Sequence, residues 1–222
     1  DVERNGYCFT DGVGCISVAL MEEIAVLVKG SKKDSAPSVV QIRAHGVKGV
    51  LAVNPDLGGR QIVFRKSQVK YSTGMSLAER KNTGFSPSPL LARNRLGTHA
   101  AVARVETKPV AKSRLVFGIA DATGLLTSGT CFFQPTIAGK RVVVTGPVAV
   151  TRNPCWWPGD VRILEAVNAE QLHHLVDCVV FPTQGQRPHA DEMGGGDLDG
   201  DQFTVIWDTD LVPKQQIEPF DY

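Results

Sequence analysis

The chain lacks the sequence features of a membrane protein, a zinc protein and a disulfide-bonded extracellular domain. None of its apolar runs reaches the length of about 18 residues that a transmembrane helix needs, and its first residues show no basic region followed by an apolar segment. Its five cysteines are odd in number, widely spread and never arranged as C-x-x-C. We therefore expect a soluble protein that binds no membrane, with reduced thiols in an intracellular compartment, cytoplasmic or nuclear.

An excess of one charge is also missing, since 24 basic and 23 acidic residues give a formal net charge of +1. Composition alone therefore does not indicate a nucleic-acid-binding domain, which is usually basic. The two signs are nevertheless separated along the chain, because many basic residues lie in the first half and acidic residues gather after position 190. Hydrophobic residues make up 42% of the chain, which is enough for a buried core.

Short apolar runs rich in β-branched residues are frequent and are separated by glycine and proline. With 22 Gly and 13 Pro, the chain does not suit an all-helical fold, and we expect a mainly β protein with short helices after Ser17 and Asn168. The predicted strands are 39–43, 49–53, 61–64, 115–119, 130–133, 141–145, 147–151, 178–181 and 203–207.

Residues 72–112 form the least regular stretch and are rich in turn dipeptides such as Ser-Pro and Thr-Gly. We interpret 72–112 as a linker or truncated insertion between one β unit at 1–71 and another at 113–222. The 222 residues are enough for one large domain or two of about 100 residues each.

The sharpest motif is an acidic cluster behind three glycines, at residues 194–201. Asp197, Asp199 and Asp201 occupy alternate positions, where like charges repel one another unless solvent or a cation neutralises them. A strand would align the three on one face, and a loop bent by glycines could bring them closer together. Oxygen ligands at this density suit Mg²⁺, for which Mn²⁺ is a possible substitute.

Two other interpretations of the acidic cluster fit the sequence less well. A solvated acidic turn would bind nothing, but the apolar strand that directly follows argues against it. A calcium loop of the EF-hand type requires Gly at its sixth position, where Gln202 stands, and Glu at its twelfth, where Asp208 stands. The sequence therefore favours a magnesium site.

Several ordered motifs resemble those of the eukaryotic, cell-encoded RNA-dependent RNA polymerases of the RNA-silencing type, and together they span nearly the whole chain. They are GGDLDGD at 195–201, FTDGVG at 9–14, QIR with the following G-x-KG at 41–49, TRNP at 151–154 with PGDV at 158–161, and VFP at 180–182. The resemblance implies two double-psi β-barrels in one chain. In that family the first barrel presents lysines and the second presents aspartates.

The resemblance also implies an activity, which is Mg²⁺-dependent nucleotidyl transfer from a nucleoside triphosphate to an RNA 3′-hydroxyl. RNA template, RNA product and nucleoside triphosphates would be the partners. Catalysis and metal binding would fall to the three aspartates, and Lys48 would be a catalytic cation. The substrate-binding residues would be Lys70, Arg65 and Arg152, although Arg152 could instead hold its own turn through Asp160.

Some features depart from the family pattern and leave alternatives open. The segment between the barrels is short, and most of the N-terminal and C-terminal regions of a longer polymerase are missing. Trp156 and Trp157 stand where the family often has a histidine; they could stack on bases, but burial between the barrels is preferred. A non-catalytic metal- and RNA-binding module and a metal-dependent nuclease remain alternative functions. Template type, primer dependence and oligomeric state are not determined by the sequence.

Overall fold

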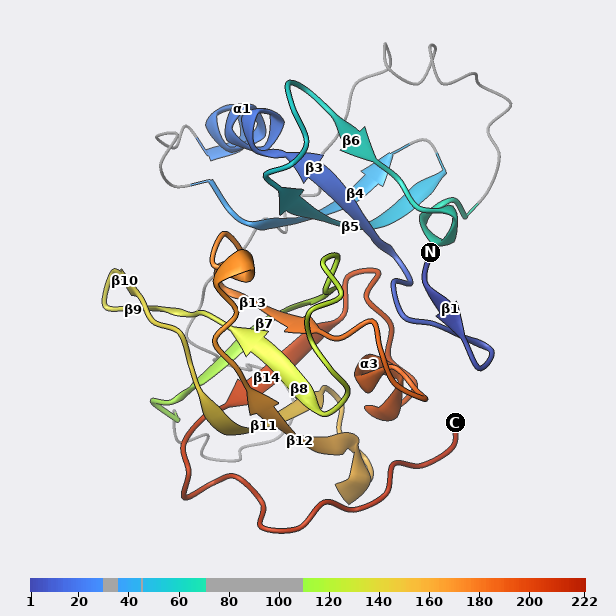
Figure 1. Ribbon diagram of the computed structural model, residues 1–222, viewed down its shortest axis with the longest axis vertical. Coiled ribbons are helices and arrows are strands. Elements are labelled where there is room, and N and C mark those ends of the chain that lie inside the picture. Colours follow the sequence, from blue (N-terminus) through green and yellow to red (C-terminus); the bar gives the residue numbers. More distant parts are fainter. Residues whose placement is uncertain (30–35, 45, 71–109) are drawn as a thin grey trace, which may run out of the picture.

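The computed structural model describes residues 1–29, 36–44, 46–70 and 110–222, and its halves lie one above the other in Figure 1. It is mainly β with few, short helices, as the sequence predicts. No helix in these described ranges is long and apolar enough to cross a membrane.

The first half contains a four-stranded sheet with the order β4-β5-β3-β6, covered by one helix. Strand β3 runs parallel to β5, while β4 and β6 are antiparallel to their neighbours. The helix packs Met21 and Ile24 onto the sheet residues Ile16 and Leu51. The elements are β1 (Glu3–Arg4), β2 (Tyr7–Cys8), β3 (Val13–Ser17), α1 (Val18–Lys29), β4 (Val39–Ala44), β5 (Val47–Asn54), β6 (Ile62–Val63) and the 3-10 turn η2 (Lys66–Gln68).

The second half contains a closed six-stranded barrel with the order β11-β12-β8-β13-β7-β14. It closes because β14 pairs with both β11 and β7, so neither edge is left unpaired. The elements are β7 (Ser113–Ala120), β8 (Thr130–Phe133), β9 (Thr136–Ile137), β10 (Lys140–Arg141), β11 (Gly146–Arg152), η3 (Pro158–Asp160), β12 (Val161–Ala166), η4 (Glu170–Leu172), β13 (Cys178–Phe181), α3 (His189–Glu192) and β14 (Gln202–Ile206).

Aromatic rings fill the barrel interior. Phe132, Phe133 and Phe203 are fully buried, and the ring centroids of Phe181 and Phe203 lie 5.0 Å apart in an edge-to-face arrangement. Gly118 on β7 makes room for this packing, because a Cβ at that position would collide with the ring of Phe203. The alternating apolar residues of the strands therefore point into one core, as expected for a small barrel.

Most predicted strands and helices are present, with one strand and one helix that differ. The expected strand at 141–145 is wrong beyond Arg141, because the N–H groups of Val142 and Val144 bond singly to Pro135 and Phe133 without forming a paired ladder. The expected helix after Asn168 shortens to the single turn η4. The predicted linker at 72–112 lies almost wholly outside the described residues, so the domain boundaries stay a prediction.

The two halves share one interface, which positions the functional site. Val13, Val50 and Ala52 of the first sheet join the apolar core of the barrel. Ser38 adds polar contacts, because its Oγ donates to the carbonyl of His174 at 3.0 Å and accepts from the N–H of Val176 at 2.9 Å. The acidic loop is at this interface as well, and the N–H of Leu198 donates to the carbonyl of Asp11 at 3.2 Å.

Candidate active site

The acidic loop lies between α3 and β14, and it faces the first half of the chain. Asp199 is mostly buried, with its side chain 11% exposed, and Lys48 of β5 reaches it with 2.6 Å between Nζ and Oδ2. The same oxygen is 3.9 Å from the amine of Lys70. Lysines of the first half therefore face an aspartate of the second half, as predicted, although these residues are far apart in sequence.

Backbone contacts explain why both amines reach the same carboxylate. The segment after η2 returns beside the start of β5, where Lys70 N–H donates to the Gly46 carbonyl at 2.8 Å. Gly12 supplies the space on the other side, since its φ of 78° favours glycine and a Cβ there would collide with Asp199. Two lysines and one aspartate thus meet at a point where the backbones approach closely.

The other two aspartates shape the loop itself. Asp197 Oδ1 accepts from the N–H of Asp199 at 3.0 Å, and Asp201 Oδ2 accepts from the N–H of Asp197 at 3.1 Å. The three acids precede β14, which begins at Gln202, so they lie on a turn rather than on one face of a strand. Their carboxylates satisfy the loop backbone as well as carrying charge.

Negative charge is least compensated at Asp197. Burial, together with the charges of Asp199, Asp201 and Asp11, raises the pKa of the Asp197 carboxyl to about 6, against a hydrogen bond from Asp199 that lowers it. Within the described ranges Asp197 forms no ion pair, whereas Lys48 pairs with Asp199 and Arg152 with Asp201. A bound cation would relieve this excess of negative charge.

The donor set suits a hard divalent cation, because every side-chain ligand would be a carboxylate oxygen. Among the residues that the structure describes, however, no three His, Cys, Asp or Glu side chains are arranged to hold a metal ion. The acids are engaged by lysine, arginine and backbone N–H groups instead. Ligation of one ion by Asp197, Asp199 and Asp201 therefore stays a prediction that requires these side chains to turn toward a common point.

Arg152 holds the glycine segment that leads into the acidic loop. Its Nε donates to the carbonyl of Met193 at 3.1 Å, and one terminal nitrogen donates to the carbonyl of Gly194 at 2.6 Å. The other terminal nitrogen lies 3.5 Å from Asp201 Oδ2. The alternative pairing with Asp160 is wrong, because Asp160 instead accepts from the N–H groups of residues 156 and 157 and from the Tyr222 hydroxyl.

A cavity of about 310 Å³ opens beside the acidic loop. Asp201 and Arg152 line it from the barrel, and Gln41 lines it from β4 of the first sheet. Its position next to two of the predicted site residues gives room for a phosphate or sugar. Substrate binding by Arg152 stays a prediction.

Comparison with known proteins identifies the family of the chain. The family model described as "RNA dependent RNA polymerase" matches residues 1–86 and 90–222. The chain belongs to the RNA-dependent RNA polymerase family. The resemblance inferred from the motifs is thereby confirmed.

Curated relatives in this family come from plants and fungi. The chain is 33% identical to RNA-dependent RNA polymerase 1 and 32% identical to RNA-dependent RNA polymerase 6, both from Arabidopsis thaliana. It is 28% identical to RNA-dependent RNA polymerase 1 of Schizosaccharomyces pombe. These matches cover 96% to 97% of the chain but 26% of each relative, so the chain spans about a quarter of their length.

A solved structure has the same fold. RNA dependent RNA polymerase QDE-1 from Thielavia terrestris superposes with a TM-score of 0.78 over 98% of this chain and 35% of its own. Sequence identity in this comparison is 18%, so it bears on the fold and not on the roles of residues.

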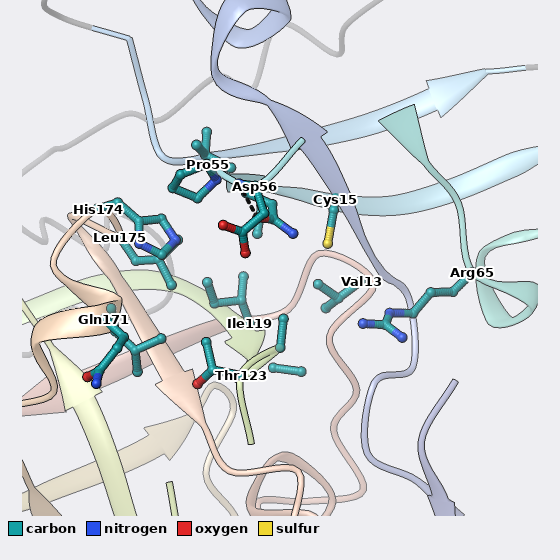
Figure 2. A pocket seen from close by; sticks show the side chains of 16 residues that line it. Val13, Cys15, Pro55, Asp56, Arg65, Ile119, Thr123, Gln171, His174 and Leu175 are labelled. Atoms are coloured by element: carbon teal, nitrogen blue, oxygen red, sulfur yellow. Dashed lines mark hydrogen bonds between the residues drawn. The ribbon is translucent and has the colours of Figure 1, made fainter. Parts of the chain in front are cut away.

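The sequence also singled out Arg65, Trp156 and Trp157. Substrate binding by Arg65 stays a prediction. Arg65 forms no ion pair with an aspartate within the described ranges, and its side chain points into a second cavity (Figure 2). The expected burial of the tryptophans is wrong, since Trp156 is 83% and Trp157 44% exposed. The turn holds them at the surface because their N–H groups are tied to Asp160.

Sequence reasoning missed two residues that contribute to the site. Asp11 adds its charge to the field at Asp197 and binds the loop through its carbonyl. Gln41 packs its amide against Gly200, where a Cβ would collide with it. Both residues lie inside motifs that support the family resemblance, and these motifs could have identified them. Only the fold shows that they face the acidic loop.

Proposed function

We propose that this chain is the catalytic core of an RNA-directed RNA polymerase, which transfers a nucleotidyl group from a nucleoside triphosphate to an RNA 3′-hydroxyl. One observation carries the proposal: the Lys48 amine and the Asp199 carboxylate, from opposite halves, meet at 2.6 Å inside the motif-bearing loop. Family membership supports the reaction type.

Asp197, Asp199 and Asp201 would hold Mg²⁺ or Mn²⁺ in this proposal. When bound, the ion supplies the charge that activates the 3′-hydroxyl and neutralises the leaving pyrophosphate. Lys48 and Lys70 stand where they can stabilise negative charge on the triphosphate or on the RNA end. Both amines lie close to the carboxylate of Asp199, so both could act on a substrate bound beside it.

Arg152 has a double role in the proposal. Its contacts with residues 193 and 194 fix the entry to the acidic loop, and its position at the wall of the 310 Å³ cavity places a guanidinium where phosphate or sugar would bind. Asp201 lines the same cavity. A substrate there would lie beside the acids that perform the chemistry.

The two-barrel architecture belongs to the same proposal. The four-stranded sheet would form part of the lysine-bearing barrel, and the closed barrel would be its partner that carries the aspartates. The likeness to the QDE-1 structure over 98% of the chain supports this arrangement. RNA and nucleoside triphosphates would be the substrates, and an intracellular location would agree with the five free thiols.

Primer extension tests the proposed activity. The chain is incubated with a primed RNA template, nucleoside triphosphates and Mg²⁺, and both extension and pyrophosphate release are measured. We expect Asp199→Asn to abolish extension, because it removes charge at the point where the lysines converge. Asp210→Asn is the matched control, since Asp210 is exposed and outside the loop.

The same assay separates the alternatives. Shortening of RNA without nucleotides, dependent on Asp199, would indicate a nuclease. Binding of RNA that depends on Mg²⁺ but gives no pyrophosphate would indicate a non-catalytic module. Extension that is unchanged in Asp199→Asn would contradict the proposed site.

A further inference from the structure

A second cavity, of about 510 Å³, lies at the interface between the two halves (Figure 2). Strands β3 and β5 and the turn after β5 form its walls on the first-half side. The end of β7 and residues 171–175 form its walls on the barrel side. Its volume is within the range of about 300–1,000 Å³ that is typical of small-molecule sites.

The lining has an apolar floor. Val13 and Ile119 are buried and come from the two different halves, and Leu172 and Leu175 are buried beside them. Such a floor favours an apolar body over a hydrated ion, because burying apolar surface releases water from both partners. A ligand here would need a compact hydrocarbon or aromatic part.

One lining residue carries a permanent charge that forms no ion pair within the described part of the chain. Figure 2 shows the guanidinium of Arg65 directed toward Val13 and the cavity. Its Nε is fully buried and has no hydrogen-bond partner among the described residues. Leaving such a donor unsatisfied is unfavourable, and an anion bound by the terminal nitrogens of the same guanidinium would offset part of this cost.

No neighbouring side chain that the structure describes forms an ion pair with this guanidinium. Burial raises the pKa of the Cys15 thiol, so this group stays neutral at pH 7 despite the nearby arginine. Burial also lowers the pKa of His174, which keeps the imidazole neutral as well. Asp56 is exposed at the rim and forms no ion pair with Arg65 in the described part of the chain.

We infer that this cavity is a binding site for a small organic anion, with its carboxylate or phosphate on Arg65 and its apolar body on the floor between the halves. The carboxylate of Asp56 would repel an anion at its own side, so the ligand has one favoured orientation. This site is separate from the proposed polymerase chemistry and does not depend on it.

Three fluorinated probes of similar size test the inference by ¹⁹F NMR line broadening. They are 4-fluorobenzoate, 4-fluorophenyl phosphate and the neutral 4-fluorobenzamide. We expect one or both anions to bind, with the amide at least about 10-fold weaker, because only the anions form charge-assisted bonds with the guanidinium. The two anions distinguish carboxylate from phosphate ligands.

Substitutions at two lining residues test whether the probes bind in this cavity. Arg65→Gln should weaken binding of the anions about 10-fold or more. It keeps the two hydrogen bonds that the backbone of residue 65 makes with Gln68, one to its side-chain oxygen and one from its N–H. Ala122→Trp at the exposed rim should block entry, whereas Ala122→Ser is the matched control that keeps binding. Circular dichroism checks that each variant is folded, and Arg65→Met replaces Arg65→Gln if the latter is not.

Three outcomes would overturn the inference. The first is no broadening of either anion at millimolar concentration. The second is equal binding of the neutral amide. The third is anion binding that persists in folded Arg65→Gln and Ala122→Trp proteins.

Discussion

The carboxylate of Asp199 is held by an amine from the other half of the chain, and this contact defines the site at the scale of single residues. Lys48 is partly exposed while Asp199 is mostly buried, so the pair is not an ordinary surface salt bridge. A buried carboxylate that loses its cation becomes unfavourable.

Lys48→Ala should lower the rate of primer extension by about 100-fold, because it removes a cation placed to stabilise developing negative charge. Extension rates at saturating nucleotide measure the effect. Lys140→Ala is the matched control, since Lys140 is exposed and has no ion pair in the described ranges. Equal rates for the two variants would show that the Lys48 amine does not act in catalysis.

Asp197 leads to a prediction about stability and pH. Its carboxyl pKa is raised from 3.8 to about 6 in the folded protein, so the folded state holds the proton more tightly than the unfolded state. The charged form is therefore penalised above pH 6, and the penalty disappears as the pH falls from about 6 to below 4. Solvent screening reduces it to about 1–2 kcal/mol.

Asp197→Asn removes this penalty. In EDTA, the variant should be more stable than the parent at pH 7 by about 1–2 kcal/mol and equally stable near pH 3.5. Urea unfolding at the two pH values measures the difference. A variant that is destabilised at pH 7 would show that the charge of Asp197 is compensated in the folded protein.

At the scale of elements, the closed barrel depends on close packing between β7 and β14. Gly118 lies where a Cβ would collide with the Phe203 ring, and that ring also contacts Phe181. All three residues lie on barrel strands, so no nearby loop can move to relieve an overpacked side chain.

Gly118→Ala should therefore destabilise the protein by about 1–3 kcal/mol through overpacking. Gly58→Ala is the control, because a Cβ at Gly58 would meet nothing within 4 Å. Urea unfolding at 25 °C compares the two variants. Similar stabilities would mean that the barrel can rearrange around the added methyl group.

The sequence predicts a strand or helix well when a short run of residues shows its pattern of apolar and polar side chains. The run Cys178–Phe181 is apolar throughout and forms a strand buried on both sides. The sequence around Trp156 misleads, because large aromatic residues are usually buried and only the turn around Asp160 keeps these at the surface. Local patterns also do not reveal that β14 closes a barrel with β11.

At the scale of the whole molecule, the candidate site exists only because two distant segments are brought together. The acidic motif identified Asp197, Asp199 and Asp201, but their hydrogen bonds with the loop backbone could not be read from residue spacing. Lys48 was found through its motif, and the fold placed it against Asp199. The position of Arg65 in the second cavity depended on long-range packing that no sequence pattern encodes.

A crystal of the protein soaked with Mn²⁺ and a nucleoside triphosphate tests the central claim most directly. We predict one anomalous peak bound by oxygen atoms of Asp197, Asp199 and Asp201, with the amine of Lys48 turned toward the phosphates. An ion bound elsewhere, with Lys48 still paired to Asp199 and the nucleotide distant from both, would contradict the account.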